Sequence, residues 1–218
     1  MIGNFIKSFR LNKVVRNFVL ADLVLFGGWG LVSPIMAIFI IGEIPGATLV
    51  TVGSMAAVYW AVRSSIELPM ATLVEKTDSE KDDLYVLILG LLLVSASAFW
   101  LNFVETIPQL FTFQAVHALG FAFYAASWSG IFSRHVDKKR VAISWAIDHT
   151  VLGIATGVTG LFGAYIAEMF GFRAIFIIAG IASLIAAILI FLVPDIILPG
   201  KKNNDAHPID HSPKTTSK

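Results

Sequence analysis

Six long apolar segments, separated by short polar turns, run through most of the chain. They lie at about residues 18–41, 47–73, 84–103, 108–132, 141–167 and 173–198. A helix that crosses a membrane needs about 20 mostly apolar residues, so each segment predicts one spanning helix. Six such helices use nearly the whole chain. The pattern therefore predicts an all-α membrane protein, a bundle of six transmembrane helices, rather than a soluble domain.

The segments that flank the bundle differ from it in composition. Residues 1–17 are predicted to form a cytoplasmic N-terminus, and residues 18–198 the six-helix transmembrane domain. Residues 199–218 are rich in Lys, Asn, Asp, Pro, Ser and Thr, which bury little apolar surface, so we predict a disordered cytoplasmic tail. The first apolar segment is longer than the core of a signal peptide, and we expect it to be retained as a helix.

The basic residues predict how the bundle is oriented. Of the 16 Lys and Arg residues, all but Arg63 and Arg173 lie in the two terminal segments or in the loops after the second and fourth helices. Short loops rich in Lys and Arg face the cytoplasm. We therefore expect an integral protein of the cell membrane, either plasma or inner, with both termini in the cytoplasm.

Composition excludes several classes of protein. Hydrophobic residues make up 56% of the chain and charged residues 14%, with a mean hydropathy of +0.78. A soluble domain has about 25% charged residues. The net charge of +1 contains no basic block, so no nucleic-acid partner is expected. The absence of cysteine excludes disulfides and thiolate metal sites. No zinc-binding pair of histidines and no nucleophile motif is present, so we expect no enzyme, metal or cofactor.

Ionisable side chains inside the apolar segments are candidates for function. They are costly in lipid and usually face protein or water. Arg63 and Glu67 lie one helical turn apart in the second segment and can pair. The pair either fixes helix packing or places charge in a cavity or gate. Asp22, close to the start of the first segment, is expected to be a solvated end charge.

Two further helices carry such candidates. Asp148 and His149 lie in the fifth segment, and Asp148 has no basic residue within one turn. It is expected to pair with Arg63, to have a coupling or substrate role, or to be a water-exposed structural residue. His117, with Gln114, lies in the fourth segment. It is either a hydrogen-bonded packing residue or a proton-linked or substrate-contacting residue.

Glycines mark two helices. The fifth segment carries Gly153, Gly157, Gly160 and Gly163, and this small-residue spacing predicts close helix packing. The first segment carries Gly27, Gly28 and Gly30 followed by Pro34, which predicts a helix that bends.

Two short motifs resemble a known family. The stretch Ala71-Thr72-Leu73-Val74-Glu75-Lys76 is similar to a loop pattern G-x-L-x-D-R, with Ala71, Leu73, Glu75 and Lys76 at its defining positions. The stretch Gly171-Phe172-Arg173-Ala174-Ile175-Phe176 resembles G-W-R-x-x-F at the entry to a sixth helix. Both patterns belong to the major facilitator superfamily (MFS), and the chain resembles one six-helix half of it over roughly residues 15–198.

The chain departs from that family at two places. The run Gln114-Ala115-Val116-His117 stands where the family often has R-x-x-Q-G, so the arginine linked to proton coupling is missing. Val158 follows Gly157 where drug antiporters have G-P-x-x-G-G. A typical drug/proton antiporter is therefore not supported.

Length is the largest departure, because the family normally has two six-helix halves with the substrate path between them. The resemblance implies a half-size secondary transporter of small solutes that works by alternating access, as a homodimer or with another half. Two alternatives stay open: a non-transporting scaffold or partner subunit, and an incomplete gene product. The resemblance also implies that the second and fifth helices of each half face the other half. In a two-fold dimer, Arg63 could then meet Asp148 of the second copy.

Overall fold

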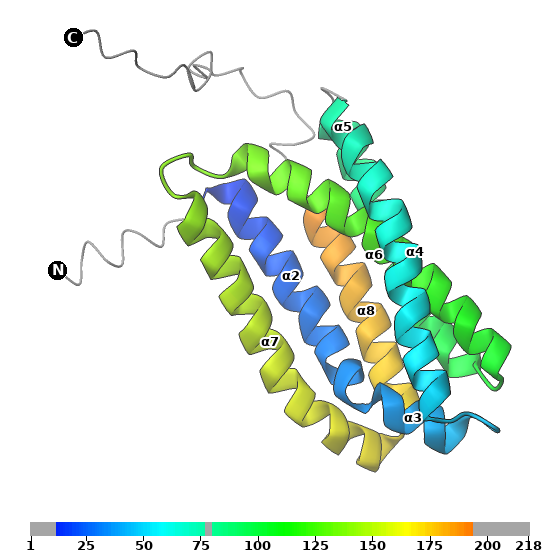
Figure 1. Cartoon of the computed structure of the whole chain (residues 1–218). Helices are drawn as coiled ribbons and strands as arrows, with labels where there is room; N and C mark the ends of the chain where they lie inside the picture. Colours follow the sequence, from blue (N-terminus) through cyan, green and yellow to red (C-terminus); the bar gives the residue numbers. More distant parts are fainter. Residues whose placement is uncertain (1–11, 77–79, 194–218) are drawn as a thin grey trace, which may run out of the picture.

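A computed structural model describes residues 12–76 and 80–193 (Figure 1). The predicted tail at 199–218 and most of the predicted N-terminal segment lie outside these residues. The elements in chain order are α2 (Lys13–Val32), η1 (Ser33–Ile35), α3 (Met36–Glu43), α4 (Leu49–Lys76), α5 (Glu80–Trp100), η2 (Leu101–Phe103), α6 (Ile107–His135), α7 (Val141–Phe170) and α8 (Phe172–Phe191).

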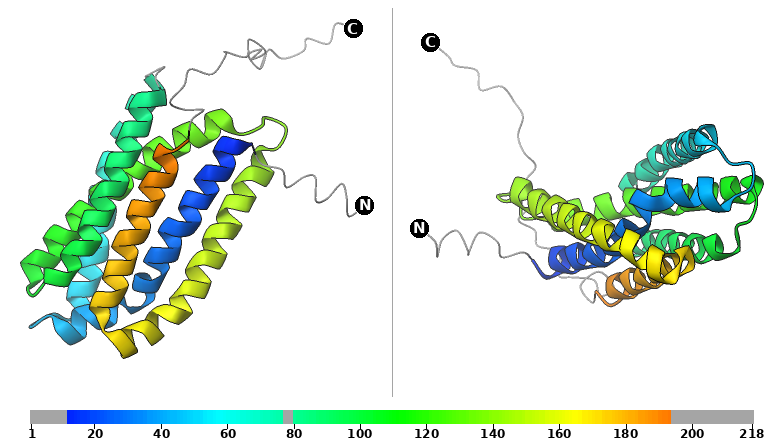
Figure 2. Two further views of the ribbon diagram at one scale, coloured as in Figure 1. Left: turned by 180° about the vertical axis from the view of Figure 1, so that it is seen from behind. Right: turned by 90° about the horizontal axis from the view of Figure 1, so that it is seen from below.

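The six long segments form a helical bundle. All six are long and apolar enough to cross a membrane, and the described part of the chain contains no strand. Helix α2 packs against α7 and α8, α5 against α6 and α8, and α4 against α6. Seen from behind, α8 lies between α2 and α5 (Figure 2). The sequence prediction of an all-α bundle with six spanning helices is confirmed.

The first spanning segment is broken near its middle. Helix α2 ends at Val32, residues Ser33–Ile35 form one 3₁₀ turn, and α3 continues from Met36. Pro34 has no backbone N–H and its ring clashes with the preceding turn of an α-helix. The bend predicted from the glycines and Pro34 is present. Helix α3, which follows the break, contacts α4.

The corner between α7 and α8 contains a single residue. Gly171 ends α7 and starts α8 with φ 80° and ψ 165°. A side chain at positive φ is strained, so glycine suits this position. At its other end α8 stops at Phe191 rather than near residue 198 as the apolar pattern predicts. Pro194 follows in the sequence, and a proline disfavours helical geometry at the residue before it.

Buried hydrogen bonds connect the central helices. The Trp29 indole Nε1 donates to the Ser183 Oγ at 3.2 Å and joins α2 to α8. The Ser95 Oγ donates to the Gly180 carbonyl oxygen at 2.9 Å and joins α5 to α8. Within a membrane such a bond contributes about 1 kcal/mol. These contacts make α2, α5 and α8 the packed centre of the bundle.

Two helices bury much less of their surface. In the most apolar window of α4 and of α7 only 11% of the residues are buried, against 50% to 56% in the other four spans. Helix α4 packs chiefly on α6, and α7 chiefly on α2. These two helices therefore form the two open edges of the bundle.

The four glycines of α7 divide into two pairs. A Cβ added at Gly163 would lie 2.1 Å from the Leu31 carbonyl oxygen, and one at Gly160 would lie 3.2 Å from the Pro34 Cγ. A Cβ at Gly153 or Gly157 would meet nothing within 4 Å. Gly160 and Gly163 thus allow α7 to approach the broken first segment closely, while Gly153 and Gly157 lie on the open side.

This division predicts opposite effects of the same substitution. Gly163→Ala should lower the free energy of unfolding by about 1–3 kcal/mol, because the new methyl group overlaps the backbone of α2. Gly157→Ala is the matched control and should be neutral or stabilising by up to about 1 kcal/mol, since alanine favours helix. Denaturant titration of the purified protein, followed by circular dichroism, measures both. Equal effects would contradict the close approach at Gly163.

Candidate functional site

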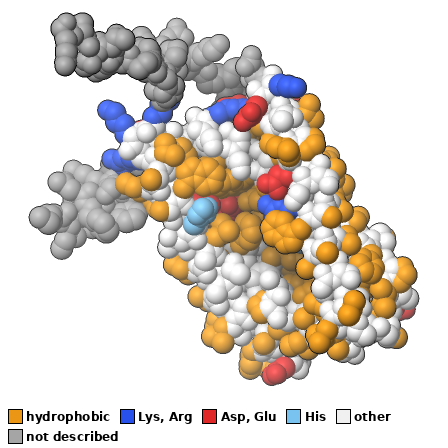
Figure 3. All heavy atoms as spheres, in the orientation of Figure 1, with side chains coloured by type: hydrophobic (Ala, Val, Ile, Leu, Met, Phe, Trp, Pro, Cys, Tyr) orange, Lys and Arg blue, Asp and Glu red, His pale blue; other side chains and the backbone are white. Residues whose placement is uncertain are grey.

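A cavity of about 390 Å³ lies between the first spanning segment and helices α4 and α6, with one wall residue from α7. Most of its wall is apolar and aromatic. Its polar and charged lining consists of Ser33, Tyr59, Arg63, Gln114, His117 and Thr156. In Figure 3 charged and histidine side chains gather in the middle of the face between α7 and α4, among hydrophobic ones. Both the volume and the mix of a few polar groups with an apolar wall are typical of small-molecule sites.

Arg63 holds a fixed position on the α4 wall of this cavity. Its Nε donates to the Glu67 Oε2 at 2.7 Å, and its Nη1 donates to the Tyr59 Oη at 2.8 Å. Both partners are four residues away on the same helix face. The Cζ also lies 5.5 Å from the ring centre of Trp60 and 6.0 Å from that of Phe121, within cation–π range. These contacts hold the guanidinium at the cavity.

His117 is enclosed by aromatic rings on α2 and α6. Its ring centre lies 4.1 Å from that of Trp29, 4.9 Å from that of Phe121 and 5.4 Å from that of Phe113. Its Nδ1 lies 3.1 Å from the Ser97 Oγ on α5. The residue is therefore both a hydrogen-bonded packing residue and part of the cavity wall.

The Ser97 hydroxyl lies within hydrogen-bond distance of two groups. Its Oγ is 2.7 Å from the Val94 carbonyl oxygen and 3.1 Å from the His117 Nδ1. A hydroxyl has one hydrogen to donate, so when that hydrogen goes to Val94 the Ser97 oxygen accepts from a protonated His117 Nδ1. Ser97 thus fixes the orientation of the His117 ring in the cavity wall.

Asp22 is not the solvated end charge that the sequence predicts. Its side chain is 2% exposed, and it accepts a hydrogen bond from the Tyr124 hydroxyl on α6. The prediction was wrong because α2 begins at Lys13 rather than near residue 18. At 1.5 Å per residue, Asp22 lies about 13 Å along the helix and inside the bundle.

Asp148 lies on α7 and is buried in its own chain. It is 3% exposed and acts electrostatically on Asp22, and its Oδ1 has no hydrogen-bond partner among residues 12–76 and 80–193. Arg63 pairs with Glu67 instead. A contact between Asp148 and Arg63 of a second copy would require the Asp148 side chain to leave this position. His149, the next residue, is exposed and lies 5.9 Å from Trp145 between ring centres.

The residues that match the loop motif lie in the last two turns of α4. Ala71 is half-buried, whereas Leu73, Glu75 and Lys76 are exposed. The backbone beside them is bound from another helix, because the Arg134 Nη2 donates to the Val74 carbonyl oxygen at 2.8 Å. The loop residues themselves are therefore placed at the end of the bundle, away from the cavity.

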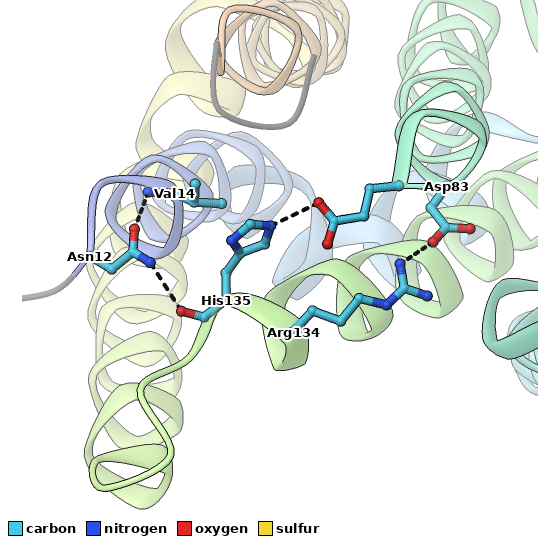
Figure 4. Close-up of polar contacts among 6 residues, drawn as sticks. Asn12, Val14, Asp83, Arg134 and His135 are labelled. Atoms are coloured by element: carbon cyan, nitrogen blue, oxygen red, sulfur yellow. Dashed lines mark hydrogen bonds and ion pairs between the residues drawn. The ribbon is translucent and has the colours of Figure 1, made fainter. Parts of the chain in front are cut away.

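Arg134 and His135 connect four helices at this end (Figure 4). The Arg134 Nη1 lies 2.5 Å from the Asp83 Oδ2 on α5, and the His135 Nε2 lies 3.0 Å from the Glu80 Oε2 on the same helix. The Asn12 Nδ2 donates to the His135 carbonyl oxygen at 3.1 Å. The cluster fixes the end of α6 against α4, α5 and the start of α2.

The structure brings together some of the predicted residues and separates others. Arg63, Gln114 and His117 line one cavity, and Glu67 adjoins it through Arg63. Asp148 lies with Asp22 instead. Sequence reasoning missed Tyr59, Trp29 and Tyr124, and it named Asp22 but gave it the wrong environment. Spacing could have found Tyr59, which precedes Arg63 by one turn as Glu67 follows it. Nothing local points to Tyr124, whose partner is far away in the sequence.

The Tyr124 hydroxyl should be needed for stability. Tyr124→Phe removes the donor to a buried carboxylate and should lower the free energy of unfolding by about 1–3 kcal/mol. Tyr85→Phe is the matched control, because Tyr85 is 63% exposed, and it should change the stability little. Chemical denaturation of both variants provides the measurement. A Tyr124→Phe protein as stable as the parent would mean that Asp22 does not depend on this bond.

Comparison of the sequence with known proteins shows the family to which the chain belongs. The family model described as Major Facilitator Superfamily matches residues 18–216. The chain is also 22% identical over 165 residues to an uncharacterized MFS-type transporter of Methanocaldococcus jannaschii, an overlap that covers 76% of this chain and 41% of the relative. The chain thus spans less than half the length of that relative. Since the family model covers most of the sequence, the chain belongs to the Major Facilitator Superfamily.

Proposed function

We propose that the chain forms one half of a secondary transporter for small organic solutes, with the Arg63–His117 cavity as its share of the substrate path. Membership in a transporter family supports transport rather than enzymatic activity. A second six-helix unit completes the path, and a second copy of this chain is the partner we propose. The observation that carries the proposal is a partly polar cavity placed between the two open edges of the bundle.

The position of the cavity supports a path between two halves. Its lining comes from the broken first segment, α4, α6 and a single residue of α7, Thr156. The same two edge helices, α4 and α7, bury only 11% of their most apolar windows. A second helical unit placed against both edges would cover the cavity, and movement between the two units would open it to each side in turn.

The chemistry of the lining supports a small organic solute. Arg63, Gln114 and His117 supply the polar contacts, while Trp29, Tyr59 and neighbouring rings supply apolar surface. Ionisable residues at membrane depth usually face a bundle interior or a water-filled cavity and mark a substrate or ion path. A purely structural scaffold has no need for such a lining, so these residues favour transport.

Cysteine labelling tests whether the cavity is a water-filled path. The chain has no native cysteine, so single cysteines can be placed without background. Ala56→Cys lines the cavity on α4. In sealed vesicles it should react with a charged methanethiosulfonate reagent from either side, about tenfold or more faster than the control, because only a thiol in contact with water forms the reactive thiolate.

Ala61→Cys is the matched control, since it is exposed on the same helix but outside the cavity lining. In the membrane it should react slowly. Equal, slow reaction of both cysteines would contradict the proposal and favour a scaffold whose α4 face is covered by lipid or protein. Fast reaction of Ala56→Cys from one side only, under every condition tried, would contradict alternating access.

A further inference from the structure

We propose that the cavity is selective for small aromatic carboxylates, which place the acid group on Arg63 and the ring among the aromatic side chains. This substrate class rests on the proposed function, since it concerns the same cavity. The geometry that carries it is one fixed guanidinium, with donors that no described residue uses, in an aromatic wall to which residues 12–76 and 80–193 contribute no carboxylate.

Charge in the cavity favours an anion. No Asp or Glu is among its lining residues in the part of the chain that the structure describes. Arg63 uses two of its five N–H donors, on Glu67 and Tyr59, and the others have no hydrogen-bond partner among the described residues. A ligand carboxylate can accept from these donors, and charge-assisted bonds of this kind are the strong ones. Glu67 competes for the guanidinium from one side only, through Nε.

The aromatic walls select a flat apolar body. Trp29, Phe113 and Phe121 surround His117, while Tyr59 and Trp60 lie beside Arg63. Stacked and edge-to-face aromatic pairs are stabilised beyond the burial of their apolar surface. The cavity of about 390 Å³ lies within the usual range for ligand sites, so this chain's share of the path has room for a single ring.

The same walls disfavour an organic cation. The Arg63 guanidinium already lies within cation–π range of Tyr59, Trp60 and Phe121, so the protein's own cation occupies the ring faces that an ammonium ligand would use. An added cation would also meet the like charge of Arg63. His117 lines the same cavity and adds no negative charge to offset this repulsion.

Radioligand binding to the purified full chain tests the proposal, with labelled benzoate at neutral pH as the probe. Benzyl alcohol and benzylamine are the competitors matched in shape, and they lack the negative charge. We expect unlabelled benzoate to compete about tenfold or more better than either, because only the carboxylate makes charge-assisted bonds.

Three variants locate the carboxylate. Arg63→Gln should weaken benzoate binding about tenfold or more, and Arg63→Lys should retain part of it. Glu67→Gln keeps Arg63 but removes its competing charge, so benzoate should bind several-fold tighter. A merely structural role of the pair would not produce opposite changes from its two members. Circular dichroism and gel filtration check that each variant is folded, and Arg63→Lys keeps the test valid where Arg63→Gln does not fold.

The outcomes separate the substrate class from the transport function. Binding of labelled benzylamine in place of benzoate, with fast labelling of Ala56→Cys, would overturn the aromatic acid and leave the path in place. No binding of benzoate by the parent chain would also overturn the aromatic acid. Weaker benzoate binding by both Arg63→Gln and Glu67→Gln would overturn the assigned role of Arg63. Slow labelling of Ala56→Cys would overturn the transport function itself.

Discussion

The arrangement of this bundle depends on one constraint: an ionisable side chain at membrane depth must find a partner or a polar cavity. Arg63 donates hydrogen bonds to Glu67 and Tyr59 on its own helix. Its guanidinium also lies within cation–π range of three rings, that of Tyr59 among them. Asp22 meets it with the Tyr124 hydroxyl from another helix. Lipid offers neither hydrogen bonds nor solvation to such groups. Asp148 is the exception, because it is buried and its Oδ1 has no hydrogen-bond partner among residues 12–76 and 80–193. The cavity lies where the inward faces of the first spanning segment, α4 and α6 meet.

The packed centre and the open edges have different roles in this account. Helices α2, α5 and α8 are joined by buried hydrogen bonds and form the packed centre of the bundle. Helices α4 and α7 pack on one side only and flank the cavity. Members of the family place the substrate path between two six-helix units. Each unit must then move as one body, which a packed centre supports. The edge helices of each unit must also stay free to contact the other unit.

Much of the fold could be predicted from the sequence, because helix number depends on apolar length and the breaks coincide with Pro34 and Gly171. The Arg63–Glu67 pair was also predictable, since its spacing is local. The burial of Asp22 could not be predicted, because it depends on where α2 begins and on Tyr124, which is far away in the sequence. The joint placement of Arg63 and His117 likewise depends on how α4 packs on α6, which helix periodicity alone does not give.

The central claim is that this cavity is half of a path that a second six-helix unit completes. Native mass spectrometry of the chain, gently extracted from membranes, tests it most directly. The account predicts a complex of about twice the 23.7 kDa chain mass, or a heavier one with another helical partner. It also predicts that dissociation of the complex exposes the edges formed by α4 and α7 to crosslinking. A stable 23.7 kDa monomer with no partner, under conditions that preserve other membrane complexes, would contradict the account.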